Sequence, residues 1–144
     1  MAELETKIKE RFFELNKRFQ STSNAFPLKF FIRHDAGGRH IEYDTSGKIS
    51  LVGTDRGTET CRLETYDIDE LMYWIFRSAA KVRAQSYQRD NHHLTGDSRR
   101  IWFPKAVEEI SKISMEWAER LKNEQNEILR KHPFNDHPIE TKPK

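Results

Sequence analysis

The chain has 144 residues, of which 33% are charged and 35% hydrophobic, and its 25 basic and 23 acidic side chains leave a net charge of +2. A chain of this length typically forms one domain with a sizeable core. Its nearly balanced charge does not by itself indicate nucleic-acid binding. The one cysteine, Cys61, excludes an internal disulfide and favours a reducing compartment.

The N-terminal residues 1–5 are acidic and amphipathic, which does not fit a secretion signal. No apolar run approaches the roughly 20 residues that a membrane-spanning helix needs. We therefore expect a cytoplasmic protein without a membrane partner.

Residues 3–20 are predicted to form the first helix. Hydrophobic side chains recur there every three or four residues, which places them on one face of a helix that packs against the core. These side chains are Leu4, Ile8, Phe12, Leu15 and Phe19. Pro27 prevents the helix from continuing into the next segment.

Between residues 27 and 66 the hydrophobic period changes from 3.6 to 2, which is typical of half-buried strands. Four runs alternate in this way, with hydrophobic positions at Leu28, Phe30 and Ile32, at Ile41 and Tyr43, at Ile49 and Leu51, and at Cys61 and Leu63. A glycine stands in each loop, at 37–38, 47 and 57, where a left-handed residue would close a hairpin. Short loops favour sequential antiparallel pairing, so the pattern predicts a four-stranded antiparallel meander.

A long helix is predicted after the strands. Asp67 can cap its N-terminus, with Glu70 three residues later as in a capping box. One face then carries Leu71, Trp74, Ile75, Ala79 and Val82.

The polar segment from Asp90 to Ser98 ends this helix, and the next one is expected from Arg99 through Lys112. Pro104 is expected in the first turn of that helix, where no amide donor is lost. Ser114 is a candidate cap for a last helix, which carries Trp117, Leu121, Ile128 and Leu129 and ends at residues 131–134.

This order predicts an α+β fold: an N-terminal helix, a four-stranded antiparallel meander, and then two to three C-terminal helices packed on one face of the sheet. We expect one domain over residues 1–134. Residues 135–144 contain little to bury and are expected to form a mobile tail.

The residues capable of chemistry indicate neither a catalytic site nor a cofactor or metal site. No two of the six histidines have the helical i, i+4 spacing of metal ligands, and a single cysteine cannot complete a typical zinc set. The Gly37–Gly38 pair lacks the following lysine and helix of a phosphate-binding loop. An enzyme centred on Cys61 with His34 or His40 is kept as an alternative.

Charge is distributed unevenly along the chain. Residues 77–105 carry seven basic and two acidic side chains, residues 64–70 carry four acidic and no basic ones, and residues 108–127 carry six glutamates against three basic side chains. These are either solvated helix faces or an oriented field that steers a charged partner.

The segment Arg99–Lys105 mixes basic with aromatic residues, as nucleic-acid-binding surfaces do, so a nucleic-acid-binding module over Arg77–Lys105 is an alternative function. Arg99 and Arg100 are poorly placed against the dipole of the helix that they begin. We expect them to find carboxylate partners, inside the domain or on another protein.

Five segments have a recognisable pattern: Tyr43–Gly47, Glu70–Phe76, Arg99–Phe103, Ile113–Trp117 and His132–Asp136. Together, over about residues 25–136, they resemble the immunity protein 63 family of bacterial polymorphic-toxin and contact-dependent inhibition systems. The resemblance implies an antitoxin without catalytic residues, which binds the C-terminal domain of a cognate toxin, often a nuclease, and blocks it in the cytoplasm.

Toxin binding is expected at the turn between the second and third helices, which is polar and rich in groups that can make paired hydrogen bonds. Its candidate residues are Asp90, His92, His93, Asp97, Arg99 and Arg100. We expect a protein partner, no nucleic acid and no cofactor, while the oligomeric state is left open.

Overall fold

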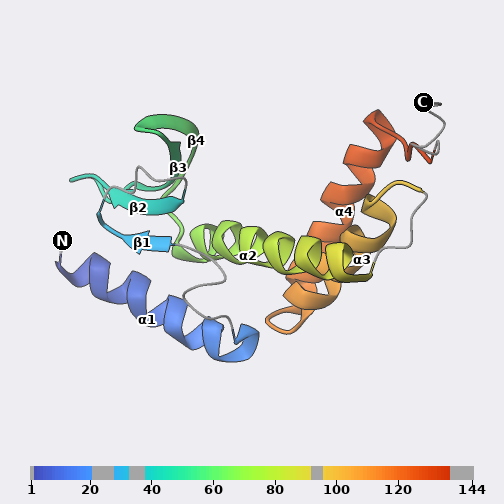
Figure 1. Cartoon of the computed structure of the whole chain (residues 1–144). Coiled ribbons are helices and arrows are strands. Elements are labelled where there is room, and N and C mark those ends of the chain that lie inside the picture. Colours follow the sequence, from blue (N-terminus) through green and yellow to red (C-terminus); the bar gives the residue numbers. More distant parts are fainter. Residues whose placement is uncertain (1, 21–27, 33–37, 92–95, 137–144) are drawn as a thin grey trace. The chain divides into compact units, whose positions relative to one another are not determined.

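The computed structural model describes residues 2–20, 28–32, 38–91 and 96–136. The elements labelled in Figure 1 are α1 (Ala2–Phe19), β1 (Leu28–Phe30), β2 (Arg39–Tyr43), β3 (Ile49–Asp55), β4 (Thr58–Thr65), α2 (Ile68–Asn91), α3 (Arg99–Ser111) and α4 (Met115–Lys131). The fold is therefore α+β, as the sequence predicts.

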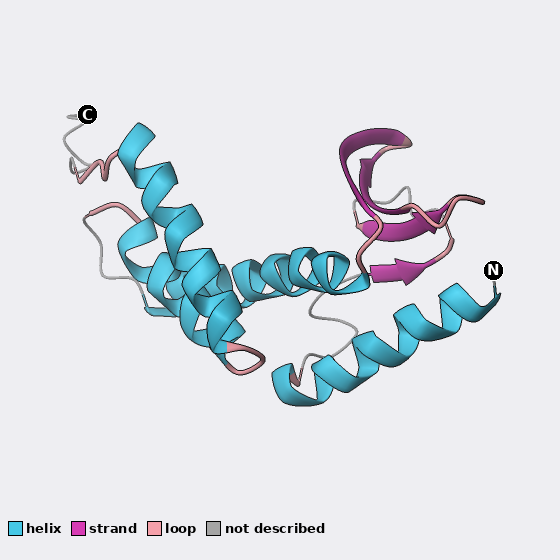
Figure 2. Cartoon of the chain, turned by 180° about the vertical axis from the view of Figure 1, so that it is seen from behind, coloured by secondary structure: helices cyan, strands magenta, loops and turns pink. Residues whose placement is uncertain are grey.

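The chain forms two compact units, residues 1–79 and residues 80–144. The first holds α1, the sheet and the first half of α2, while the second holds the rest of α2 with α3 and α4. The strands, magenta in Figure 2, all belong to the first unit, and the described part of the second unit consists of helices and loops. A single domain over residues 1–134 stays a prediction, as does the packing of all C-terminal helices on one face of the sheet.

The sheet has the strand order β1-β2-β3-β4 and is mixed. β2, β3 and β4 pair antiparallel as predicted, but β1 is parallel to β2, so the predicted antiparallel meander is wrong at its first pair. β1 ends early because Phe31 has a φ of +65°, and its amide donates to the carbonyl of Ile41 at 3.0 Å. Ile32, which we expected in the strand, lies outside it and is 65% exposed. The expected glycine turn at Gly37 lies outside the described residues.

The other two expected hairpins form, and their turns explain why. In the first, the carboxylate of Asp44 accepts the amides of Ser46 and Lys48, and Gly47 has a φ of +90°. In the second, Arg56 and Gly57 have φ angles of +55° and +81°. Two successive positive φ angles give the two-residue turn whose twist matches that of the strands it joins.

The core of the first unit lies between α1, α2 and the sheet. The ring of Phe12 stacks on that of Phe76, with centroids 5.3 Å apart, and meets Phe30 of β1 edge-on at 5.3 Å. Other side chains buried in this unit include Ile8, Leu15, Phe19, Ile41, Ile49, Leu51, Leu71 and Ile75. The α1 stripe thus packs as predicted, whereas β3 departs from prediction, because every residue from Ile49 to Thr54 is buried instead of every second one.

The helix ends follow the predicted caps at two positions. The carboxylate of Asp67 accepts the amide of Asp69 at 2.9 Å, and the hydroxyl of Ser114 accepts the amide of Trp117 at 3.1 Å. The expectation for Pro104 is wrong, because this residue lies inside α3, five residues after its start. Pro104 has no amide hydrogen, so it cannot donate to the carbonyl of Arg100 as a helical residue would.

None of the helices within the described residues combines the length and the apolar character that crossing a membrane requires.

Candidate functional site

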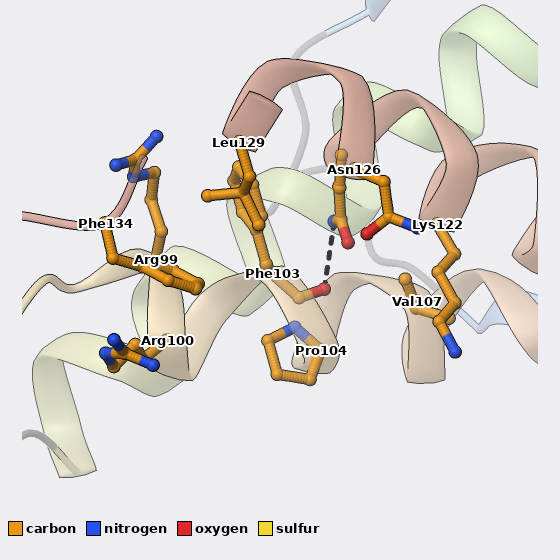
Figure 3. Close-up of a pocket in the computed structure, with 10 residues that line it drawn as sticks. Arg99, Arg100, Phe103, Pro104, Val107, Lys122, Asn126, Leu129 and Phe134 are labelled. Carbon is orange, nitrogen blue, oxygen red and sulfur yellow. Dashed lines mark hydrogen bonds between the residues drawn. The ribbon is translucent and has the colours of Figure 1, made fainter. Parts of the chain in front are cut away.

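A groove of about 350 Å³ lies between α3 and α4 in the second unit (Figure 3). Its lining residues come from the two helices and from the segment that follows α4, and they are Arg99, Arg100, Phe103, Pro104, Val107, Lys122, Gln125, Asn126, Leu129 and Phe134. Its lining therefore combines apolar side chains with cationic and amide groups.

The two helices that form the groove are held together at its floor. The buried side-chain amide of Gln125 donates to the carbonyl of Phe103 at 2.9 Å, which Figure 3 draws as a dashed line. Phe103 and Ile110 of α3 are buried, as are Ala118 and Leu121 of α4. This packing holds together the two helices that form the groove.

Residues 132–136, which we call the C-terminal strap, contribute Phe134 to the lining of the groove, and Arg99 holds this segment against α3. Its Nη1 donates to the carbonyl of His132 at 2.9 Å, and its Nη2 donates to that of Pro133 at 3.0 Å. The same guanidinium donates to Asp97, with a shortest distance of 2.7 Å. Asp97 in turn accepts the amide of Asn135 at 2.9 Å, so Arg99 and Asp97 together bind three backbone groups of the strap.

Arg100 makes the second attachment of the strap. Its Nε and Nη2 donate to the carboxylate of Asp136 at 2.9 and 2.7 Å, and its guanidinium carbon lies 4.0 Å from the centre of the Phe134 ring. Asp136 also accepts the amide of Asp97 at 2.9 Å. The paired geometry and the stacked ring together fix the direction of this arginine.

The carboxylates of the strap region also offset the charge at the start of α3. The helix has no acidic residue in its first turn, and its N-cap residue Ser98 makes no side-chain cap hydrogen bond. Asp97 and Asp136 bring two carboxylates to this end, where a negative charge is favourable. Hydrogen bonds from Arg100 lower the pKa of Asp136 to about 2. Hydrogen bonds from Arg99 lower the pKa of Asp97 well below its usual range. The expected carboxylate partners of the two arginines therefore lie within the chain.

Two groups at the groove keep unused hydrogen-bond donors. Nη1 of Arg100 and Nζ of Lys122 donate to no acceptor among the described residues, and both side chains are exposed. Figure 3 shows Arg100 and Lys122 on opposite sides of Pro104. None of the described residues that line the groove is acidic. The groove therefore offers hydrogen-bond donors and positive charge at separate points of an apolar surface.

Comparison with known families gives a match. Residues 45–127, which are 83 of the 144 residues, match the family described as immunity protein 63. The chain belongs to the immunity protein 63 family. Comparison with curated proteins and with solved structures gives no match.

The match covers most of the segments that carry the resemblance in the sequence. Glu70–Phe76, Arg99–Phe103 and Ile113–Trp117 lie within it, Tyr43–Gly47 lies partly within it, and His132–Asp136 lies beyond its end. Most of the groove of this immunity protein thus belongs to the matched part, whereas the strap does not.

The structure brings together three of the six residues predicted for toxin binding. Asp97, Arg99 and Arg100 form the attachment of the strap, and both arginines line the groove. Asp90 is exposed in the last turn of α2. His92 and His93 lie outside the described residues.

Sequence reasoning missed the α4 side of the groove and the strap. Lys122, Asn126 and Leu129 follow one another at spacings of four and three residues, a signal that places them on one helix face. This signal was present, but the polar residues in it resembled a solvated surface. The contact of Phe134 with Arg100 had no local signal, because the two residues lie 34 positions apart.

The basic segment of residues 77–105 contributes largely to internal contacts of the immunity protein. Arg83 of α2 donates to the buried carboxylate of Glu109 at 2.8 Å, and Lys112 donates to it at 3.0 Å. Burial raises the pKa of Glu109, but the hydrogen bonds from Arg83 and Lys112 outweigh this effect and hold the pKa below its usual range. Lys81 and Lys105 lie over the rings of Trp102 and Tyr87, at 5.8 and 4.5 Å from the ring centres.

The proposed enzymatic pair of Cys61 and His40 is not brought together. Cys61 pairs across the sheet with Gly53, which pairs with Arg39, and the Arg39 guanidinium lies 3.9 Å from the thiol sulfur. His40 follows Arg39 in β2, so its side chain lies on the opposite face, where Nε2 is 2.7 Å from Glu42. His34 lies outside the described residues. The described residues also contain no group of three potential metal ligands.

Proposed function

We propose that this protein neutralises a cognate bacterial toxin domain by binding to it in the cytoplasm. The observation that carries the proposal is the family match over residues 45–127, since an immunity protein implies a protein toxin as its partner. We infer that the toxin is the C-terminal domain of a larger protein, with a nuclease as the leading candidate for its activity.

The groove supports a binding role because it offers what protein interfaces use. Apolar side chains lie in it beside Arg100, which is held by a bidentate ion pair with Asp136 and by the ring of Phe134. Arginine and aromatic side chains contribute disproportionately to the affinity of protein interfaces. A preformed surface of this kind also reduces the loss of side-chain entropy on binding.

The alternative of a nucleic-acid-binding module over Arg77–Lys105 has less support. Arg83, Arg99 and Arg100 each form an ion pair with a carboxylate, and Lys105 lies 3.3 Å from Glu109. Neutralised side chains release fewer counterions when they meet phosphates, so they contribute less to nucleic-acid affinity.

Co-expression tests the proposal directly. The toxin domain encoded beside this chain is produced in a bacterial host, with and without this protein, and colony survival is counted. We expect survival only when the protein is present, together with co-purification of the two chains. Death of the co-expressing cells would contradict the proposal, and a steeply salt-dependent affinity for DNA or RNA without a protein partner would favour the alternative.

A further inference from the structure

We propose that the groove between α3 and α4 is a docking point for an acidic segment of the toxin domain, which places a carboxylate at Lys122, a hydrogen-bond acceptor at Nη1 of Arg100 and an apolar side chain between the helices. The inference rests on the proposed function and adds to it the surface and the chemistry of the partner.

The charge of the groove lining favours an acidic partner. The lining has no acidic residue within the described part of the chain, and its cationic residues are Arg99, Arg100 and Lys122. Asp97 and Asp136 pair with Arg99 and Arg100, so the unpaired positive charge among the described lining residues is that of Lys122. Arg99 is held by Asp97 and by two backbone carbonyls, so its donors serve the strap. Nη1 of Arg100 and Nζ of Lys122 remain, and an ionised carboxylate is the protein group that satisfies such charged donors best.

The side chain of Arg100 is already oriented by contacts within the chain. Its Nε and Nη2 are used on Asp136 and its plane is covered by Phe134, which leaves Nη1 as the end of the guanidinium that a partner can reach. Because these contacts hold the side chain already, a partner loses little rotamer entropy in using it.

An apolar surface separates the two donors. Half-buried Val107, Leu129 and Phe134 and exposed Pro104 line the groove, and its volume of about 350 Å³ has room for one or two side chains of a partner. A segment that carries only charged side chains would leave this apolar surface in contact with water. An acidic residue next to an apolar one satisfies both parts.

A nucleic-acid strand fits this groove less well than a protein segment. Proteins that bind a single nucleic-acid strand contact its backbone with rows of cations and stack its bases on exposed aromatic rings. Here two unused donors stand on either side of Pro104, and the ring of Phe134 is already engaged by Arg100.

The decisive variant is Lys122→Glu, because Lys122 is exposed and has no ion-pair partner among the described residues, so the change reverses a charge at the groove and leaves the fold intact. Binding of the purified toxin domain is measured by titration calorimetry, and association by stopped flow. We expect the affinity to fall on the order of tenfold or more, with slower association and a weaker salt dependence. Lys122→Met, which removes the charge but keeps the stem, is expected to fall in between.

The matched control is Lys7→Glu, the same charge reversal at an exposed residue of α1 that does not line the groove. We expect it to bind within about twofold of the parent. Thermal unfolding of all variants shows whether they are equally folded. Replacing an acidic residue of the toxin by lysine, chosen by scanning its surface acids against Lys122→Glu, is expected to restore affinity for that variant alone.

The outcomes separate the two proposals. If the parent protein protects cells and Lys122→Glu binds the toxin domain as tightly as the parent, the groove assignment is wrong while the function stands. If Lys7→Glu weakens binding equally, the effect is one of overall charge, and the assignment is also wrong. Failure of the parent to bind overturns both proposals, and a loss of nucleic-acid binding in Lys122→Glu would replace the protein segment by a nucleic acid.

Discussion

The guanidinium of Arg100 binds the carboxylate of Asp136 through two nitrogens, at 2.9 and 2.7 Å, across 36 positions of sequence. This ion pair joins the first turn of α3 to the strap that follows α4. It orients the side chain of Arg100 in the groove. It also brings a negative charge to the N-terminus of α3, which has no acidic residue in its first turn.

Two substitutions of Asp136 distinguish the contribution of its charge to stability from that of its hydrogen bond to the Asp97 amide. Asp136→Asn keeps an oxygen that accepts the Asp97 amide but removes the charge next to Arg100, whereas Asp136→Ala removes both. We expect a lower unfolding temperature for both variants, with a larger loss for alanine. Amide hydrogen exchange at Asp97 should become faster only in the alanine variant. Equal exchange in both would show that the amide does not depend on this acceptor.

The same ion pair predicts a pH dependence in acid. Hydrogen bonding from Arg100 lowers the pKa of Asp136 from 3.8 to about 2. A carboxylate whose pKa is lower in the folded state contributes stability above its unfolded pKa, and that contribution is lost as the pH falls through the folded pKa. We therefore expect the Asp136 carboxyl carbon to titrate near pH 2 in an NMR experiment and to return toward its ordinary value in Arg100→Gln. An unchanged midpoint in that variant would contradict the assignment.

Glu109 is expected to be the most sensitive charged position of the second unit. Its side chain is only 4% exposed and meets Arg83, Lys105 and Lys112, so Glu109→Gln leaves three cations without their shared partner. We expect a loss of about 1 to 3 kcal/mol of unfolding free energy, below the value for a fully buried pair because Arg83 and Lys112 remain in contact with water.

The control for Glu109 is its neighbour Glu108, which is 65% exposed and lies 3.4 Å from Lys105. Urea unfolding of Glu108→Gln should change by less than about 0.5 kcal/mol. Because the pKa of Glu109 lies below its usual range, the difference between the two variants should persist at neutral pH and shrink as the pH falls through that pKa. Similar losses of unfolding free energy for both variants would show that burial does not determine how much Glu109 contributes to stability.

Gln125 links α4 to α3 through the Phe103 carbonyl, and Gln125→Met keeps the volume of the side chain while it removes the donor. We expect a loss of about 1 kcal/mol in unfolding free energy, the usual net contribution of one hydrogen bond. Asn123→Met, at an exposed position of the same helix, is the matched control and should be nearly neutral. A neutral Gln125→Met would mean that packing alone joins the helices.

Gly57 is expected to tolerate no ordinary side chain without strain. Its φ is +81°, although no atom lies within 4 Å of the place that a Cβ would occupy. Gly57→Ala should cost about 1 to 2 kcal/mol from backbone strain alone, and Gly57→Asn should cost less, since asparagine adopts this conformation more readily. Thermal unfolding of the two variants gives the comparison. Equal stability of the alanine variant and the parent would contradict the strain argument.

Local patterns predicted much of the fold. The stripe from Leu4 to Phe19 forms α1, glycine at 47 and 57 closes two hairpins, and Ser114 caps α4. Each of these features depends on residues within a few positions of one another, which is the range over which periodicity and turn chemistry act.

The site was predicted only in part. Arg99, Arg100 and Asp97 were recognised as charged groups at a turn, and the dipole of α3 required carboxylate partners for the arginines. The α4 face with Lys122 had a helical spacing but no feature that distinguished it from a solvated surface. Gln125 could not be predicted, because its acceptor is a backbone carbonyl of another helix.

The sequence by itself determined which segments are helices and strands, where most of them end, and to which family the chain belongs, because these properties follow from local spacing and residue type. Only the tertiary structure decided that β1 runs parallel to β2 and that Asp136 is the partner of Arg100. The direction of β1 depends on its pairing with Arg39–Ile41 of β2, which the alternation of side chains within each strand does not encode. The ion pair depends on where α4 ends relative to α3, which is set by the packing of the two helices.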